Sequence, residues 1–313
     1  MKNLRLAISV LAGVLIIYLL SGEINLNYLR TRVSDVSWPY LTAAFGVYFL
    51  LNVVRAFRFE LLLNKEIKFS QMLNIVLVQN FFNVVLPFRI GELSYLHFVR
   101  KRGIGFGRNL ASLIGARFLD LASIVFIFSV ALIFLSKKVD NAFWFLFSSV
   151  TVLLILTVLF FILLWSGARL ERFVRSGKPS GFGSLMLGKF VETYRAIREF
   201  RRRHQLVKSI LLSLTIWLLT FLVGMFLFRG FQINFGLYQA VFAYAFPVVI
   251  SFTPLYFFAG IGSYESVATL GLMLLGVSKE TAINSSLLLH GVELSFVLIL
   301  ALAGYWAMFA SKR

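Results

Sequence analysis

Long apolar runs recur along the chain, and short polar segments that carry most of the basic residues separate them. A helix needs roughly 20 apolar residues to cross about 30 Å of hydrocarbon, and several of these runs have that length. The pattern predicts membrane-spanning helices at 4–20, 38–57, 115–136, 143–165, 209–229 and 284–309. We therefore expect an all-α polytopic membrane protein with about six full spans.

Two further apolar segments, 70–87 and 238–259, are interrupted by proline or glycine. Proline lacks a backbone N–H and disfavours helical geometry in the residue before it. The residues expected to break or hinge these helices are Pro87, Gly91, Pro254, Gly260 and Gly262. Each segment is thus expected to belong to a broken or re-entrant helical hairpin, and the sequence leaves open whether 70–87 and 238–283 span the bilayer fully.

Composition supports one transmembrane domain over residues 1–313. The chain is 59% hydrophobic and only 14% charged, with a mean hydropathy of +0.87, which is more apolar surface than a soluble domain can bury. The absence of cysteine excludes disulfides and thiolate chemistry. The three histidines show no metal-ligand spacing, so we expect neither a metal nor another cofactor.

Basic residues orient the predicted spans, because loops rich in lysine and arginine stay in the cytoplasm. Segment 166–208 holds eleven Lys/Arg and three acidic residues, and we assign it to the cytoplasm. Both termini then lie inside a multi-pass protein of the cytoplasmic (inner) cell membrane, with an uncleaved first span favoured over a cleaved signal. The basic residues of these loops account for the net charge of +18, so no nucleic-acid partner is expected. The same loops can bind the head groups of anionic lipids.

Two distant stretches, "PFRIGELSYLHFVRKRGI" and "FFAGIGSYESVATLGLMLLGVSKE", share a pattern of sparse polar residues. One offset of 173 positions maps Glu92 to Glu265, Gly103 to Gly276, Ser112 to Ser285, Arg117 to His290 and Asp120 to Glu293. The alternative is that this match arose by chance. Ionisable residues are rare in this chain, however, and the distribution of lysine and arginine independently gives the two stretches opposite orientations in the membrane. We therefore predict inverted repeats, 1–165 and 209–313, joined by 166–208, as in secondary transporters.

The repeated acids and bases predict a polar cavity inside the bilayer. A charge in hydrocarbon costs about 2.5–3.5 kcal/mol on insertion scales, so it persists where it pairs or faces water. Spacing of i, i+3 puts the base and the acid of each copy on one helix face. The predicted substrate-binding and translocation residues are Arg89, Glu92, Arg117, Asp120, Glu265, His290 and Glu293.

Each of these residues also has a simpler structural interpretation. The alternatives are a topology anchor for Arg89, helix N-terminal capping for Glu92 and Glu265, a structural ion pair for Arg117 with Asp120, and a satisfied buried ring for His290. Two further basic residues, Arg55 and Arg58, are expected to extend to the membrane interface from the end of their span.

Three motifs resemble a known family. "LPFRIGE" (86–92), "ARFLD" (116–120) and "FAGIGSYES…LLGV" (258–277) are similar to the flippase-like membrane family related to the N-terminal transmembrane domain of lysylphosphatidylglycerol synthases. The resemblance covers nearly the whole chain and implies movement of lipids between leaflets. The synthases make their aminoacylated lipid in a separate soluble domain, so with the chain stopping at Arg313 the resemblance implies no aminoacyl transfer here.

The resemblance leaves the substrate open, because other relatives are linked to hopanoid or polyprenyl-linked glycan pathways. The sequence also departs from the family at two positions. Tyr95 stands where a basic residue is frequent, and His290 stands where arginine is common. Because histidine titrates near neutrality, a permanent positive charge in the second half is in doubt.

We expect a lipid flippase or transporter that moves the polar head group of a phospholipid, aminoacyl-phospholipid or polyprenyl-linked lipid through a charged cavity. Its expected partners are membrane lipids, anionic or polyprenyl-linked, and a homo-oligomer is left open. The alternatives are a membrane-embedded transferase, with acidic residues as acid or base, and a proton-coupled small-solute transporter. No nucleotide motif is present, so we expect no enzyme; transport direction and coupling ion are not specified.

Overall fold

The computed structural model describes residues 22, 24–87, 90–137, 139, 142–175, 194–195, 205–253 and 255–310. These residues form helices and connecting turns with no strand among them, which confirms the predicted all-α class. The predicted first span, 4–20, lies outside the described residues. So do two predicted functional positions, Arg89 and Pro254.

The other predicted spans are helical. In chain order the helices are α2 (Leu26–Ser34), α3 (Trp38–Leu62), α4 (Phe69–Val85), α5 (Glu92–Arg100), α6 (Phe106–Leu135), α7 (Ala142–Arg175), α9 (Gln205–Gly230), α10 (Leu237–Ile250), α11 (Ser263–Met273) and α12 (Lys279–Ala310), with the short 3₁₀ helix η3 (Phe258–Gly260) before α11. Among the described helices, α3, α6, α9 and α12 are long and apolar enough to cross a bilayer.

Several helices are longer than their apolar runs. Helix α6 begins at Phe106 rather than 115, and α7 continues through Arg175. Segment 166–208 is therefore not all loop, because its first residues belong to α7 and its last to α9. Hydropathy marks the part of a helix that matches hydrocarbon, whereas backbone hydrogen bonding continues into polar residues at either end. Helix α2, which lacks an apolar run, was not predicted.

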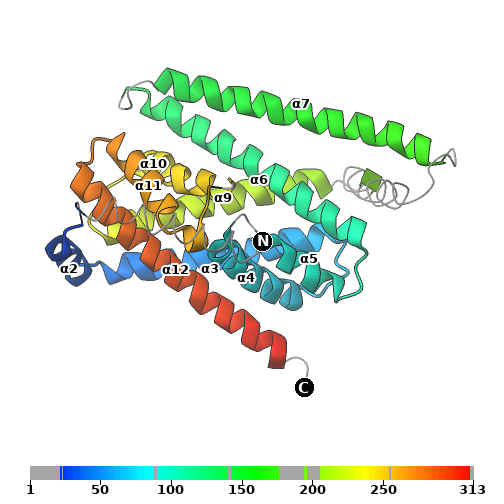
Figure 1. The fold of residues 1–313 in the computed structure, drawn as a ribbon, viewed down its shortest axis with the longest axis horizontal. Helices are drawn as coiled ribbons and strands as arrows, with labels where there is room; N and C mark the ends of the chain where they lie inside the picture. Colours follow the sequence, from blue (N-terminus) through cyan, green and yellow to red (C-terminus); the bar gives the residue numbers. More distant parts are fainter. Residues whose placement is uncertain are drawn as a thin grey trace.

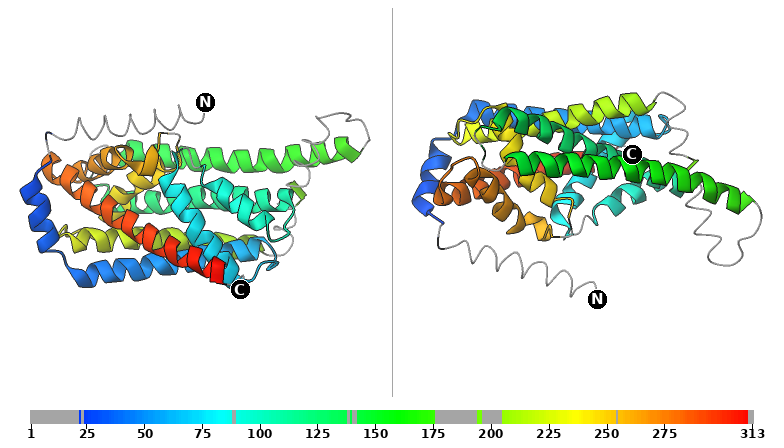
Figure 2. Two further views of the ribbon diagram at one scale, coloured as in Figure 1. Left: turned by 60° about the horizontal axis from the view of Figure 1, so that its bottom comes forward. Right: turned by 90° about the horizontal axis from the view of Figure 1, so that it is seen from above.

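Helices α3 and α9 form an antiparallel pair along one side of the bundle (Figures 1 and 2). Hydrogen bonds tie both ends of the pair: Ser37 N donates to Gly230 O at 3.0 Å, and Gln205 Nε2 donates to Asn64 Oδ1 at 2.9 Å. Helix α6 packs on α9, and α7 lies along α6 on the outside. The largest buried apolar cluster joins α3, α6, α9, α10 and α12, so the core is built around this pair.

The turn from α3 to α4 and the turn from α9 to α10 share a left-handed residue and a closing hydrogen bond, although Lys65 also has a positive φ of 60° and its counterpart Ile233 does not. Asn64 has a φ of 55°, and Gln232, 168 positions later, has a φ of 64°. Each turn is closed by one 2.8 Å backbone hydrogen bond, and these bonds are Lys65 N to Glu60 O and Ile233 N to Phe228 O. This agreement lies in backbone geometry and includes no shared residue type, so the sequence comparison could not detect it.

The turns after α5 and α11 also correspond. Gly103 and Gly276, 173 positions apart, have φ values of 88° and 84°, a left-handed conformation that ends helices and that glycine adopts without steric cost. The Gly103 N–H donates to Arg100 O at 3.0 Å, and the Gly276 N–H donates to Met273 O at 2.9 Å. The long helices that follow, α6 and α12, run in opposite directions (Figure 1).

Two helical hairpins, α4–α5 and α10–α11, bring their turns toward each other inside the bundle (Figure 2). Leu86, before Pro87, is extended with φ −87° and ψ 132°, as expected for a residue that precedes proline. The second turn is longer, contains η3 and packs on α4. Gly260 and Gly262 within it have φ values of 73° and 80°.

Gly91 has a different role from the hinge that the sequence suggested. Its φ of −55° and ψ of −24° are ordinary helical values at the start of α5. A Cβ atom at this position would overlap the backbone of Phe82 and Asn83 in α4. Glycine is therefore needed here because the two arms of the first hairpin approach each other closely.

We predict that Gly91→Ala destabilises the fold by about 1–3 kcal/mol, the usual cost of overpacking, because neither backbone segment can give way cheaply. The measurement is the apparent melting temperature of the detergent-solubilised protein. Gly115→Ala in α6 is the matched control, since nothing lies within 4 Å of its added Cβ and alanine favours helix over glycine. Equal melting temperatures for the two variants would show that the hairpin arms are not closely packed.

Candidate functional site

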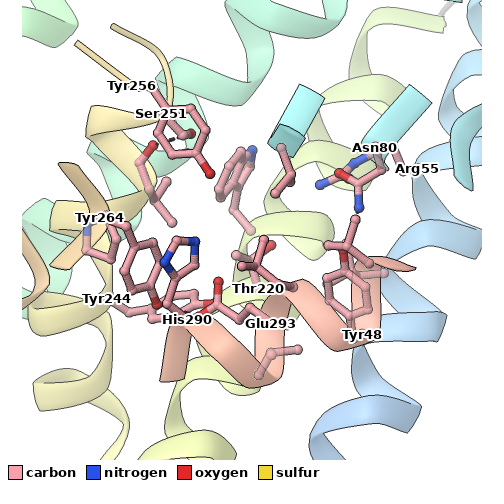
Figure 3. A pocket seen from close by; sticks show the side chains of 18 residues that line it. Tyr48, Arg55, Asn80, Thr220, Tyr244, Ser251, Tyr256, Tyr264, His290 and Glu293 are labelled. Carbon is pink, nitrogen blue, oxygen red and sulfur yellow. Dashed lines mark hydrogen bonds between the residues drawn. The ribbon is translucent and has the colours of Figure 1, made fainter. Parts of the chain in front are cut away.

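A cavity of about 150 Å³ lies between α3, α4, α9, α10, α11 and α12 (Figure 3). A second cavity of about 120 Å³ adjoins it toward α6. The residues that line both cavities are Arg55, Asn80, Val84, Trp217, Ser251 and Tyr256. The C-terminal part of α4 and the turn of the second hairpin thus border one pair of adjoining cavities.

The structure distributes the predicted site residues between the walls of these cavities and the layer behind them. His290 and Glu293 line the first cavity, and Arg117 lines the second. The other three predicted acids, Glu92, Asp120 and Glu265, line neither of the two cavities. Each contacts a base in the layer behind the cavity walls or on the walls themselves. Arg89 lies outside the described residues.

Asp120 is the centre of a buried hydrogen-bond network. Arg58 donates to both of its carboxylate oxygens, at 2.6 and 3.2 Å, and Trp217 Nε1 donates to Oδ1 at 2.9 Å. Arg58 also donates to Ser213 Oγ at 2.7 Å. The network therefore joins α3, α6 and α9, and it places the Trp217 ring on the wall of both cavities.

The expectation that Arg58 extends to the membrane interface is wrong, because its side chain is 0% exposed. Helix α3 continues to Leu62, beyond the predicted end at 57, and the arginine faces α6 and α9 rather than lipid. Arg55 likewise lies on the walls of both cavities. A buried arginine is tolerated when its donors are matched by a carboxylate, which Asp120 supplies to Arg58.

Arg117 connects the first hairpin to this network. Its Nε lies 2.7 Å from Glu92 Oε1, and its Nη1 donates to Asp120 Oδ2 at 3.3 Å. The Arg117 and Glu92 side chains are 21% and 22% exposed. The predicted Arg117–Asp120 ion pair is present, and a second carboxylate from the first turn of α5 joins it.

The second hairpin has an equivalent contact at the same 25-residue spacing. His290 Nδ1 lies 2.7 Å from Glu265 Oε1, with both side chains 4% exposed. Glu265 also caps α11 by accepting the Gly262 N–H at 2.7 Å. An ionised carboxylate only accepts hydrogen bonds, so Nδ1 carries the proton in this contact. His290 Nε2 is buried and has no partner among the described residues.

The Glu293 carboxylate contacts a tyrosine hydroxyl, whereas the other predicted acids contact a base. Tyr264 donates its hydroxyl to Glu293 Oε1, and Tyr244 lines the same cavity. The Tyr264 ring stacks on His290, with centroids 4.2 Å apart and 8° between the planes. Glu293 therefore sits among aromatic rings at one side of the cavity (Figure 3).

The sequence analysis did not identify most of the uncharged residues that line the first cavity. The residues that it did not assign include Tyr48, Asn80, Trp217, Tyr244, Tyr256 and Tyr264. A signal existed in α3, where Tyr48, Asn52 and Arg55 recur at helical spacing inside an apolar span. The tyrosines of α10 and α11 gave no such signal, because aromatic residues are common throughout the chain.

Comparison with known protein families identifies the family of this chain. The family model for the "Lysylphosphatidylglycerol synthase TM region" matches residues 4–301, which is nearly the whole chain. A search of curated proteins finds no match. Together with the long apolar helices, the family match identifies a multi-pass membrane protein.

We predict that Asp120→Asn destabilises the protein by about 3–5 kcal/mol, because it leaves Arg58 charged and buried without a carboxylate. Thermal unfolding in detergent measures the change. The control is Glu66→Gln, which breaks the exposed Arg108–Glu66 pair and should cost less than about 1 kcal/mol. Similar losses in the two variants would mean that Arg58 finds compensation elsewhere.

Proposed function

Because the chain belongs to the family of the lysylphosphatidylglycerol synthase TM region, we propose that it moves a polar lipid head group between membrane leaflets. The head group passes through the central cavities while the acyl chains stay in the bilayer. The observation that carries the proposal is the pair of adjoining cavities whose walls include Arg55, Arg117, His290 and Glu293. Ionisable residues in this position mark substrate pathways in membrane proteins.

The proposed architecture is a pair of inverted repeats with re-entrant hairpins. It is supported by the matched turns after α3 and α9, by the positive φ of Gly103 and Gly276, and by the opposite directions of α6 and α12. The 2.7 Å contacts Glu92–Arg117 and Glu265–His290 hold each hairpin to the long helix that follows. Inverted repeats allow alternating access by movement of one half against the other.

We propose transport rather than catalysis, in the cytoplasmic membrane and with membrane lipids as partners. Asp120, Glu92 and Glu265 are each engaged with a base, which supports a structural role for these carboxylates. Proton-coupled movement of a small solute is the second candidate, favoured by the closeness of His290 and Glu293 on one wall. Solute uptake driven by a pH gradient without lipid movement would support it.

The proposed function predicts that the purified protein accelerates phospholipid exchange between the leaflets of liposomes. Phospholipids with a fluorescent acyl chain are added to both leaflets, and a membrane-impermeant quencher reports how fast the inner pool becomes accessible. Glu293→Gln should slow exchange by roughly tenfold or more, because a charge-assisted hydrogen bond at the cavity is worth about 1.5–3 kcal/mol.

Protein-free liposomes and Glu280→Gln are the controls for this assay. Glu280 carries the same charge in the first turn of α12, where it accepts an exposed hydrogen bond from Asn25 away from the cavity walls. Exchange no faster than in protein-free liposomes, with phospholipid and polyprenyl-phosphate probes alike, would refute lipid transport.

The inverted topology predicts that the α3–α4 and α9–α10 turns face opposite sides of the membrane. The chain has no cysteine, so Lys65→Cys and Asn234→Cys, both at exposed positions, each introduce a single thiol. In intact cells a membrane-impermeant maleimide should label Asn234→Cys, and it should label Lys65→Cys only after lysis. Labelling of both thiols from the same side would rule out the inverted arrangement.

A further inference from the structure

Arg55 and Glu293 stand apart from the other charged residues of the site. Both line the first cavity, and among the described residues neither forms an ion pair. The neighbouring ionisable groups are in contact with a group of opposite type. Arg58 and Arg117 contact Asp120, Arg117 also contacts Glu92, and His290 contacts Glu265. An unmatched charge inside a membrane bundle is costly, so a ligand that matches both charges gains binding energy.

The two charges lie on opposite sides of the cavity (Figure 3). Arg55 lies beside Asn80, and its Nη1 makes only long, 3.4 Å contacts with Asn52 Oδ1 and Asn80 Oδ1. A guanidinium has five N–H donors in a planar fork. Arg55 therefore retains donors for an anion, and the fork geometry suits two oxygens of one phosphate.

The side that holds Glu293 presents hydrogen-bond acceptors and aromatic faces. The Glu293 carboxylate has acceptor sites beyond the one that Tyr264 occupies. His290 Nδ1 contacts Glu265, and the buried Nε2 of the same ring has no hydrogen-bond partner among the described residues. A ring nitrogen without a proton accepts a hydrogen bond, so Nε2 can receive an N–H from a ligand. Acceptors surrounded by tyrosine rings favour a cation that bears N–H groups.

We propose that the cavity binds a zwitterionic lipid head group of the phosphoethanolamine class. Its phosphate lies at Arg55, and its primary ammonium lies at Glu293 and His290 Nε2. This assignment deepens the proposed transport function and rests on it. The cavity of about 150 Å³ is of the size that accommodates benzene in an apolar protein interior, so the two charges of the ligand must be joined by a short linker.

The proposal discriminates between head groups by charge and by hydrogen bonding. A phosphoglycerol head group satisfies Arg55 and leaves Glu293 unmatched. A trimethylated ammonium has no N–H to donate to His290 Nε2. A lysyl-bearing head group brings a second ammonium, for which the cavity wall has no second unpaired carboxylate among the described residues.

The test compares exchange rates of four lipids in liposomes that contain the full chain. The probes are acyl-labelled phosphatidylethanolamine, phosphatidylcholine, phosphatidylglycerol and lysylphosphatidylglycerol. Phosphatidylethanolamine should exchange roughly tenfold faster than phosphatidylglycerol, because one charge-assisted contact separates them. In parallel, binding of glycerophosphoethanolamine and glycerophosphoglycerol to the detergent-solubilised protein is measured by ligand-observed NMR.

Substitutions test which charge of the head group each side of the cavity binds. Glu293→Gln should remove the preference for phosphatidylethanolamine over phosphatidylglycerol, whereas Arg55→Gln should slow all phosphate-bearing lipids and keep their order. Glu280→Gln and Arg108→Gln remove the same charges at exposed positions, and both should retain the wild-type preference. The binding measurement on the unmodified chain decides the matter should a cavity variant fail to fold.

The outcomes separate this inference from the proposed function. Exchange of all four lipids at one rate, or preference for phosphatidylglycerol or lysylphosphatidylglycerol, overturns the zwitterion site and leaves lipid transport standing. Selective binding of glycerophosphoethanolamine without lipid exchange retains the site and removes transport. Loss of preference in Glu280→Gln equal to that in Glu293→Gln also overturns the inference.

Discussion

The pairing of buried charge is the constraint on which the rest of the structure depends. Arg58 is fully buried and donates two hydrogen bonds to Asp120, which also accepts one from Trp217. This contact joins α3, α6 and α9 at one point. Removing either partner would leave the other as an uncompensated ion in a low-dielectric interior, which costs several kcal/mol. The relative positions of the three helices, and with them the wall formed by Trp217, follow from this requirement.

Each hairpin is held by a variant of the same contact. An acid in the first turn of α5 or α11 meets a base 25 residues later on the long helix that follows. An acid in the first helical turn also interacts favourably with the helix dipole, so the capping role and the ion-pair role are compatible. Glu265 has both, since it accepts from Gly262 N and contacts His290 Nδ1. The residues that fix the hairpins therefore also shape the cavity between them.

The sequence was sufficient for features that depend on local composition, and insufficient for those that depend on helix packing. Apolar runs located every described span, and the 173-position register located the acids and bases that hold the hairpins. Helix ends were misplaced, because hydropathy does not report where backbone hydrogen bonding stops. That error put Arg58 at the interface. Gly91 was assigned to flexibility because its close contact with α4 is visible only in three dimensions.

The charged residues of the two hairpins and of the helices that follow them are paired differently, which explains why one carboxylate remains available. In the first half Arg117 contacts both acids, Glu92 and Asp120, and Asp120 gains a second arginine from α3. The position in α9 that corresponds to Arg58 at the 168-position offset is Phe226.

In the second half an imidazole replaces the guanidinium, and it offers two ring nitrogens in place of five N–H donors. His290 uses Nδ1 on Glu265, and Glu293, which lies 173 positions after Asp120, accepts the Tyr264 hydroxyl and forms no ion pair among the described residues. The half with a full set of arginines thus closes its charges into a structural network. The second half has histidine and phenylalanine at the corresponding positions, and it leaves the Glu293 carboxylate on the wall of the cavity that Arg55 also lines, where we propose that the polar part of a substrate binds.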